Sequence, residues 1–585
     1  MSVRFKVKWG WVAIALCWAI GSIVFSVSAM TAPANLLTDP FLQLPTATSV
    51  NVVWFTEFAG TQHYVTYGDR LEFKVLAQTS RLQRTREDAD SHRPDPPTHP
   101  TYRPIWRHEA TVTGLPRNLR IPYQVTSVRE DGQLVNSRQF TLAGTPTQGR
   151  SLTALLTSDH QLKPMVAANL QKAKATAGHI DLVLMAGDLV DIPDRASEWF
   201  DDAAGGAFFP ALQGLAHYDL TKADHTIQYQ GGEIIQHAPM YTAIGNHEVM
   251  GGFSVSRSLK DQFRDARPQA IAARHYEDQL ATVNPMEHPA VQAAWIKNHS
   301  FNTETYEAIF TLPTNPFGDK RYYAATFGDV RLIVLYATHV WRSPLLDPDT
   351  RGKYQERARD FDQPDAWGWG QHIFEPIAKG SPQYTWLEQE LQSSEFQQAK
   401  YKIVMLHNPP HSLGENSVPA FTDPVQVIER DDQGHITAIR YEYPTEQDYL
   451  ARDLVPLLES AGVQLVFYGH SHLWNRFVSP GGMHLLESSN VGNSYGAYVG
   501  DRQRRVPQNY QECYAAVGDP NGLTPVVPTI APLRDDTGHP LPYIASNDLT
   551  VFSLFHSDRG TVSSYYFDTR DPNSAVVKFD EFRLD

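Results

Sequence analysis

The stretch PMYTAIGNHE, from Pro239 to Glu248, is an apolar run that ends in a glycine, an amide, an imidazole and a carboxylate. Four further apolar runs also end in side chains that can bind a metal ion. Such runs alternate with helix-like segments after Gly149, which predicts an α/β architecture with buried strands. Ligands of open α/β sheets bind beyond the carboxyl ends of the strands, so we expect one shared site. The other four runs are SLTALLTSD ending at Asp159, DLVLMAGD ending at Asp188, KIVMLH ending at His407, and VQLVFYGHSH ending at His472.

Glycines precede three of these polar ends, at Gly187, Gly245 and Gly469. We expect them at sharp turns from strand to loop, where a side chain would obstruct the backbone or a bound metal. Two divalent ions that assist attack on phosphorus need a bridging carboxylate, with oxygen and imidazole ligands on each side. Each motif alone would also suit a helix cap or a turn, but the five ends together supply that ligand set.

The order of the motifs is typical of one enzyme family. The sequence resembles the calcineurin-like metallophosphoesterases, whose pattern is D-x-[H or G], GD, GNH[ED], H and GHxH. The resemblance implies a centre of two metal ions per chain, Zn, Mn or Fe, because carboxylate, amide and imidazole ligands suit all three metals. The ligands implied are Asp188 as the bridge, Asp159 and His472 on the first ion, and Asn246, His407 and His470 on the second.

Two positions depart from the family patterns. Gln161 stands where the family has His or Gly, and its amide oxygen can bind a metal or hold a bound water, so it is kept as a candidate ligand. The chain is also similar to the purple acid phosphatases in domain layout and in PQYTWLEQEL, from Pro382 to Leu391. Those enzymes carry a tyrosinate ligand three residues beyond the bridging Asp, and here that residue is Asp191. The resemblance therefore fails at the purple chromophore.

His247 is the candidate catalytic residue. It adjoins Asn246, but the resemblance assigns it to neither metal. A leaving alkoxide needs a proton, and His247 is placed to donate one as a general acid. The alternative role is structural support of the metal site.

The region before Gly149 predicts a separate all-β sandwich over residues 35–149. Val50, Val52 and Trp54 alternate onto one face of a strand. The stretch HEATVTGLPRNLRIPYQV, from His108 to Val125, resembles the fibronectin-like N-terminal domain of the purple acid phosphatases. Residues 85–107 are rich in Pro, Asp, His and Arg without periodicity, which predicts a long surface loop.

The predicted fold of residues 150–585 is the α/β metallophosphoesterase arrangement, a four-layer β-sandwich flanked by helices. Two insertions are expected, at about 250–401 and 501–548. The first contains another predicted strand in DVRLIVLY, from Asp329 to Tyr336, and we expect it to overhang the site and set substrate choice.

The N-terminus predicts export. Basic residues precede an apolar run from Trp9 to about Val27 and the small pair Ser28 and Ala29, which is the pattern of a signal peptide over residues 1–29. An uncleaved membrane anchor is the alternative, because the run approaches the roughly 20 residues that span a bilayer. The predicted location is therefore secreted or periplasmic, with membrane association only if the segment stays uncleaved.

The composition limits the classes of function that this chain can have. The net charge of -15 argues against a nucleic-acid-binding surface, which needs clustered Lys and Arg. The sequence predicts a binuclear metal-dependent hydrolase of small phosphate esters, most directly an exported phosphomonoesterase. A phosphodiesterase or nucleotidase is the alternative within the family, and a secreted binding protein with a degenerate hydrolase domain is the alternative from another class.

Overall fold

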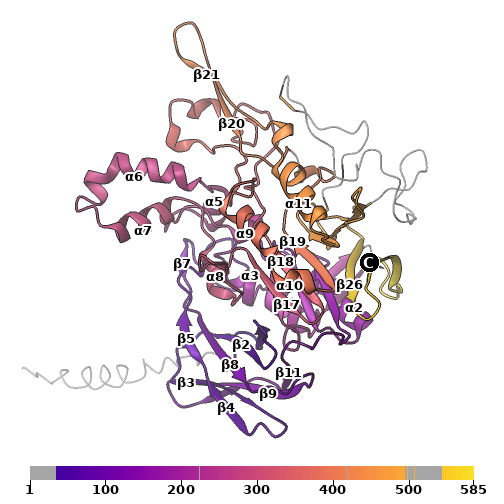
Figure 1. The fold of residues 1–585 in the computed structure, drawn as a ribbon. Coiled ribbons are helices and arrows are strands. Elements are labelled where there is room, and N and C mark those ends of the chain that lie inside the picture. The colour runs from indigo at the N-terminus through magenta and orange to yellow at the C-terminus, as the bar shows by residue number, and fades with distance from the viewer. Residues whose placement is uncertain (1–34, 223, 418, 495–496, 498–505, 508–542) are drawn as a thin grey trace, which may run out of the picture.

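The computed structural model describes residues 35–222, 224–417, 419–494, 497, 506–507 and 543–585 (Figure 1). The predicted signal peptide, 1–29, and most of the predicted insertion 501–548 lie outside these residues. None of the helices within the described ranges is long and apolar enough to cross a membrane.

The N-terminal region forms two antiparallel sheets that enclose one core. Val50, Val52 and Trp54 of one sheet pack in the same cluster as Tyr123 and Val125 of the other, which confirms the predicted alternation. Similarity to a fibronectin domain stays a prediction. One sheet has the order β1 (Phe41–Gln43), β2 (Ser49–Thr56), β8 (Trp106–Thr113), β5 (Gln78–Arg81). The other has the order β10 (Leu134–Asn136), β9 (Ile121–Val128), β3 (Gln62–Tyr67), β4 (Phe73–Leu76), with β11 (Phe140–Leu142) beside β9.

The prediction of a surface loop over residues 85–107 is wrong for its first part. There β6 (Arg86–Glu87) pairs with β7 (Thr101–Tyr102), and residues 85–88 are buried. Arg86 forms an ion pair of 2.6 Å with Asp194, and Asp88 forms one of 3.0 Å with Arg195. The charged residues of this segment form buried ion pairs with the region that follows the sandwich, because buried charges need partners. We call Arg86–Asp88 the β6 strap.

The region after Gly149 is built on two mixed sheets packed face to face. Ser553 Oγ donates a hydrogen bond of 3.1 Å to Ser488 Oγ across them, and their apolar residues share one core. The first sheet has the order β16 (Met240–Thr242), β13 (Leu182–Met185), β12 (Thr153–Thr157), β26 (Leu549–His556), β27 (Thr561–Asp568), β28 (Val577–Arg583). The second has the order β17 (Tyr323–Phe327), β18 (Val330–Val334), β19 (Tyr401–Met405), β22 (Leu465–Tyr468), β24 (His484–Ser488), β23 (Trp474–Val478), β25 (Tyr543–Ile544).

Helices lie on both sheets, which confirms the predicted α/β class. Helix α2 (Val166–Ala177) packs on β26, and α9 (Pro382–Glu390) is joined to β18 by an ion pair of 2.6 Å between Arg331 and Glu390. The remaining elements of these layers are α3 (Ala196–Phe200), α4 (Phe208–Gln213), the hairpin of β14 (Tyr218–Lys222) and β15 (His225–Tyr229), α10 (Ser394–Gln398) and α11 (Val455–Ser460).

The segment 250–401 contains both core and peripheral elements. The strand predicted in 329–336 is confirmed as β18, which pairs with β19 inside the second sheet. The peripheral helices are α5 (Leu259–Arg264), α6 (Gln269–Val283), α7 (Pro289–His299) and α8 (Glu304–Ile309). Helices α6 and α7 project to one side, and the hairpin of β20 (Val425–Arg430) and β21 (Ile436–Glu442), which the sequence did not indicate, projects from the top (Figure 1).

Candidate metal centre

The predicted ligands lie beyond the ends of parallel strands of both sheets. Strands β12, β13 and β16 run parallel in the first sheet, as do β19 and β22 in the second, so their carboxyl ends open at the same edge. All these ligand side chains are buried. They are Asp159 after β12, Asp188 after β13, Asn246 after β16, His407 after β19, and His470 and His472 after β22.

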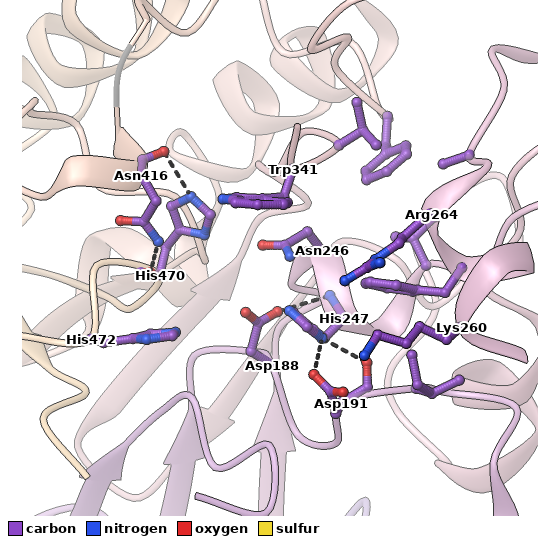
Figure 2. Close-up of a pocket in the computed structure, with 16 residues that line it drawn as sticks. Asp188, Asp191, Asn246, His247, Lys260, Arg264, Trp341, Asn416, His470 and His472 are labelled. Carbon is purple, nitrogen blue, oxygen red and sulfur yellow. Dashed lines mark hydrogen bonds and ion pairs between the residues drawn. The ribbon is translucent and has the colours of Figure 1, made fainter. Parts of the chain in front are cut away.

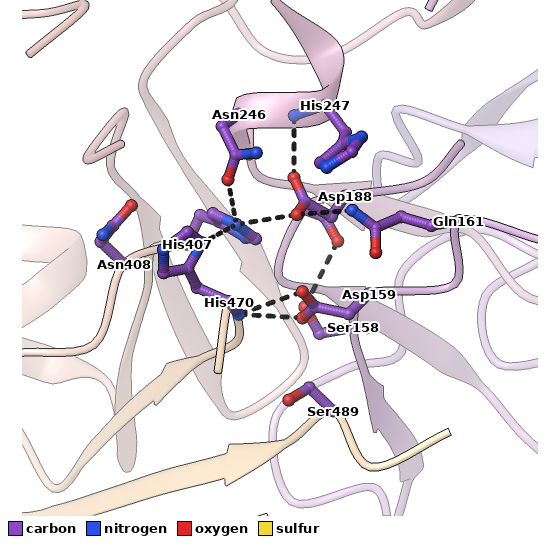
Figure 3. A network of polar contacts seen from close by, with 12 residues as sticks. Ser158, Asp159, Gln161, Asp188, Asn246, His247, His407, Asn408, His470 and Ser489 are labelled. Carbon is purple, nitrogen blue, oxygen red and sulfur yellow. Dashed lines mark hydrogen bonds and ion pairs between the residues drawn. The ribbon is translucent and has the colours of Figure 1, made fainter. Parts of the chain in front are cut away.

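Four candidate ligand atoms converge around His407. Its Nε2 lies 3.2 Å from Asp188 Oδ2 and 3.2 Å from His470 Nδ1 (Figure 3). It lies 3.3 Å from Asn246 Oδ1. Ligands about 2.1 Å from one ion stand roughly 3 to 3.4 Å from each other. The spacing of these four atoms therefore fits a single ion between them, and we call them the His407 group.

Hydrogen bonds on the far side of each imidazole fix the nitrogen that faces this point. His407 Nδ1 donates to the carbonyl of Ala186 at 2.8 Å, and His470 Nε2 donates to the carbonyl of Asn416 at 3.3 Å. Burial and the nearby His407 hold the pKa of His470 well below its ordinary value, so it is the neutral imidazole that metals bind. Burial favours neutral His407 as well, but Asp188 raises its pKa to about 9, so an ion must displace a proton there.

Asp159, Asp188 and His472 form a second group, which shares Asp188 with the first. His472 Nε2 lies 3.4 Å from Asp159 Oδ1, and its Nδ1 donates to the carbonyl of Asn493 at 2.9 Å. Burial opposes the charge of Asp188, but His407 and His247 hold its pKa below its ordinary value. Asp188 is therefore a carboxylate that faces both groups, as the predicted bridge requires.

The side chain of Asp191 stands beside His247. His247 Nδ1 donates to the backbone carbonyl of Asp191 at 2.7 Å and lies 3.5 Å from its carboxylate. The backbone N–H of His247 donates to Asp188 Oδ1 at 2.9 Å. The carbonyl can only accept, so Nδ1 carries a proton and Nε2 is the nitrogen left to meet a substrate.

A pocket opens beside the His407 group and His247 (Figure 2). Its far wall comes from the segment 250–401, including Lys260, Phe263 and Arg264 of α5 and the later residue Trp341. Lys260 and Arg264 are exposed cations one helical turn apart, and 46% of Trp341 is exposed. This wall agrees with the expectation that the segment overhangs the site, and its effect on substrate choice stays a prediction.

A family model described as calcineurin-like phosphoesterase matches residues 152–473, which is more than half of the chain. This chain belongs to the calcineurin-like phosphoesterases. Its structure is similar to that of purple acid phosphatase PPD1 from yellow lupin (Lupinus luteus) seeds, with a TM-score of 0.51, 15% identity, and coverage of 93% of this chain and 73% of that one. At this identity the likeness concerns the fold. No curated protein matches the chain at a significant level.

Family membership confirms the resemblance found in the sequence. It identifies the chain as a hydrolase of phosphate esters, and it implies a binuclear metal centre. The His407 group fits one ion of such a centre. The second group does not fit the other ion as it stands, because a cation is already present. Lys163 Nζ lies 2.7 Å from His472 Nε2, closer than Asp159 does.

Gln161 lies between these two groups of the phosphoesterase. Its Nε2 donates to Asp188 Oδ2 at 2.9 Å, and its Oε1 accepts from Lys163 Nζ. The amide oxygen that was expected to face a metal thus faces the lysine ammonium. The ligand role of Gln161 stays a prediction. The sequence did not indicate that Lys163 would compete with a metal for its oxygen.

The turns of the phosphoesterase centre are strained. Backbone in the left-handed region costs a non-glycine residue roughly 1 to 3 kcal/mol, and it clusters at functional sites. The candidate ligands with this left-handed backbone are Asp159 (φ 57°), Asp188 (φ 55°), His470 (φ 79°) and His472 (φ 56°).

The expectation for the three glycines is confirmed. A Cβ on Gly245 would lie 2.9 Å from His407 Cε1, and one on Gly187 would lie 2.8 Å from His407 Nδ1. A Cβ on Gly469 would meet the carboxylate of Asp159. Each turn passes too close to a ligand for any side chain.

Two buried glutamates that sequence reasoning left without a role support the ligand loops. Glu248 accepts the backbone N–H groups of Asp188 at 2.8 Å and Gly245 at 2.8 Å. Glu487 accepts the N–H of Ser471, between the two ligand histidines, at 2.8 Å. Glu248 ends the GNHE motif, so the sequence carried a signal for it, whereas nothing near Glu487 marked that residue.

Proposed function

We propose that this phosphoesterase is an exported phosphomonoesterase that uses the His407 group to hold a catalytic metal ion and His247 as its general acid. The observation that carries the proposal is the convergence of Asp188, Asn246, His407 and His470 beside a pocket that His247 also lines. Zn, Mn and Fe all suit these ligands.

An ion in this group would supply Lewis-acid charge to the phosphate oxygens and favour attack by water. The protein's own side chains would orient and protonate the leaving group. Asp191 fixes the ring of His247 through Nδ1, so that Nε2 donates a proton to the leaving alkoxide.

The pocket wall supports a monoester over a diester. A phosphate monoester carries up to two negative charges, whereas a diester carries one. Lys260 and Arg264 add two exposed cations beside the site of an acidic protein. Arg264 can also bind two phosphate oxygens through its planar guanidinium. These cations favour the doubly charged ester.

A nucleotidase is the second candidate, and Trp341 favours it. This side chain lines the pocket and is 46% exposed, so a flat base can stack on its indole. Trp341→Ala should raise KM for a nucleoside monophosphate while leaving KM for glycerol phosphate unchanged. Equal effects on both substrates would argue against the nucleotidase.

Export is supported by the basic start and the apolar run before residue 30. N-terminal sequencing of the protein from the producing cell should begin near Met30. Full-length chain in a membrane fraction would support the anchored alternative, and full-length chain in the cytosol would overturn export.

The function is tested with the purified mature chain, loaded in turn with each candidate metal. Aryl phosphate, bis-aryl phosphate and a nucleotide should give a kcat/KM that is highest for a monoester. His470→Asn should lose activity on all three, because one ligand of the ion is gone. Arg264→Met should lower kcat/KM for the monoester more than for the diester. A preference for the diester would overturn the monoesterase proposal, and inactivity with every metal would favour the binding-protein alternative.

A further inference from the structure

We infer that the ammonium of Lys163 takes the place of one of the two metal ions that the family implies, so that the centre binds a single ion tightly. The inference concerns metal content and does not depend on which phosphate ester is the substrate. Its basis is the arrangement of side chains around Lys163.

The ammonium lies among the atoms that would bind the missing ion. Lys163 Nζ donates to His472 Nε2 at 2.7 Å, which occupies the lone pair that a metal would use. It also donates to the Oε1 of Gln161, the other candidate donor of this group. Lys163 is only 6% exposed, so the side chain is held inside rather than in solvent.

The backbone before Lys163 is shaped to direct it inward. Gln161 (φ 40°) and Leu162 (φ 54°) are consecutive residues in the left-handed region, a conformation that non-glycine residues rarely adopt. The N–H of Gln161 donates to the carbonyl of Leu189 at 3.1 Å, and the N–H of Lys163 donates to that of His160 at 2.7 Å. This tight turn sends the side chains of Gln161 and Lys163 toward the same group.

The departure from the family pattern at Gln161 then has an explanation. The amide of Gln161, in place of an imidazole, gives a neutral oxygen that accepts from the ammonium, while its Nε2 still donates to Asp188. Asp159 and Asp188 contribute two negative charges, and one divalent ion with Lys163 contributes three positive ones. The centre therefore keeps the positive excess that attracts a phosphate ester.

Metal counting tests the inference. The mature chain is stripped with a chelator, dialysed against Mn²⁺ or Zn²⁺, and analysed for bound metal per chain. Wild type should hold one ion and Lys163→Met two. Lys163→Met combined with Asp159→Asn should return to one, which locates the added ion. Lys174→Met is the matched control, because Lys174 bonds to Gly178 on the exposed side of α2, and it should match wild type.

Anomalous diffraction from wild-type crystals soaked in Mn²⁺ keeps the test independent of how the variant folds. One peak beside His407 and His470, with none between Asp159 and His472, would support the inference. A second peak with Lys163 turned away would overturn it, as would one ion in both wild type and folded Lys163→Met. Metal counts are read without any substrate, so a failure here is distinct from a failure of the proposed phosphatase activity.

Discussion

Acid is expected to destabilise the N-terminal sandwich through one buried histidine pair. The rings of His63 and His108 stack with centroids 3.6 Å apart. His108 is completely buried; its Nε2 lies 2.8 Å from Thr56 Oγ1 and its Nδ1 lies 2.9 Å from Thr79 Oγ1. Thr56 Oγ1 gives its own proton to the carbonyl of Phe58, so it accepts from Nε2–H and Nδ1 accepts from Thr79. The neutral ring therefore has both nitrogens satisfied.

The size of the effect follows from the pKa of His108. Burial, with His63 and Arg107 nearby, lowers this pKa from 6.5 to about 2. A base with a lowered pKa in the folded state contributes its full stability above the unfolded pKa of 6.5 and loses it as the pH falls below that value. Each pH unit below it costs about 1.4 kcal/mol, so the sandwich should lose about 2 to 3 kcal/mol by roughly pH 4.5.

Hydrogen exchange of the amides in β2 and β8 measures this loss. The free energy of opening should fall by this amount between about pH 7 and pH 4.5 in wild type, after correction for intrinsic exchange. His108→Gln keeps polar contacts with the two threonines but cannot titrate, so its opening free energy should change much less. His179→Gln, at an exposed histidine, is the control. Equal pH dependence in wild type and His108→Gln would show that protonation of His108 does not cause the loss.

Three further predictions concern the metal centre. His247→Asn should keep its metal but slow alkyl phosphates by about 10²- to 10⁴-fold, and esters of acidic phenols far less. Equal slowing of both ester classes would exclude proton donation. Gly245→Ala should weaken metal binding and lower stability by about 1 to 3 kcal/mol, measured by calorimetry and urea unfolding, because its Cβ would clash with Asp188 first and also with His407. Unchanged binding and stability would contradict this clash. The iron-loaded protein should show no visible tyrosinate band, because Asp191 stands in that position, and a strong band would contradict this.

The sequence predicted which side chains gather at the candidate centre, because most of them follow a local rule. Asp159, Asp188 and His407 each end an apolar run, and parallel strands bring such ends to one edge. The strand in 329–336 was predictable from its continuous apolar character, which marks a strand buried on both faces.

Features that depend on pairing between distant segments were not predictable. Lys163 follows a ligand motif in a polar loop, where a lysine normally extends into solvent, and only the partners His472 and Gln161 show that it turns inward. The β6 strap likewise has the charged composition of an exposed loop. Only the structure shows that Asp194 and Arg195 pair with its charges. A single sequence records which side chains are charged but not which charges meet.

The β6 strap connects the N-terminal sandwich to the catalytic region through buried charged contacts. Asp88 accepts the N–H of Leu259 at 2.6 Å, at the start of the helix that carries Lys260 and Arg264, and it also pairs with Arg195. Arg195 in turn forms an ion pair of 2.9 Å with Glu198. Glu198 accepts the N–H of Asp191, and the carbonyl of Asp191 accepts a hydrogen bond from His247. Removing one partner of such a buried pair costs about 3 to 5 kcal/mol. The change of composition near residue 149 therefore does not mark a boundary at which the two regions could be exchanged separately. A catalytic region joined to another N-terminal domain would leave both its pocket helix and His247 without their support.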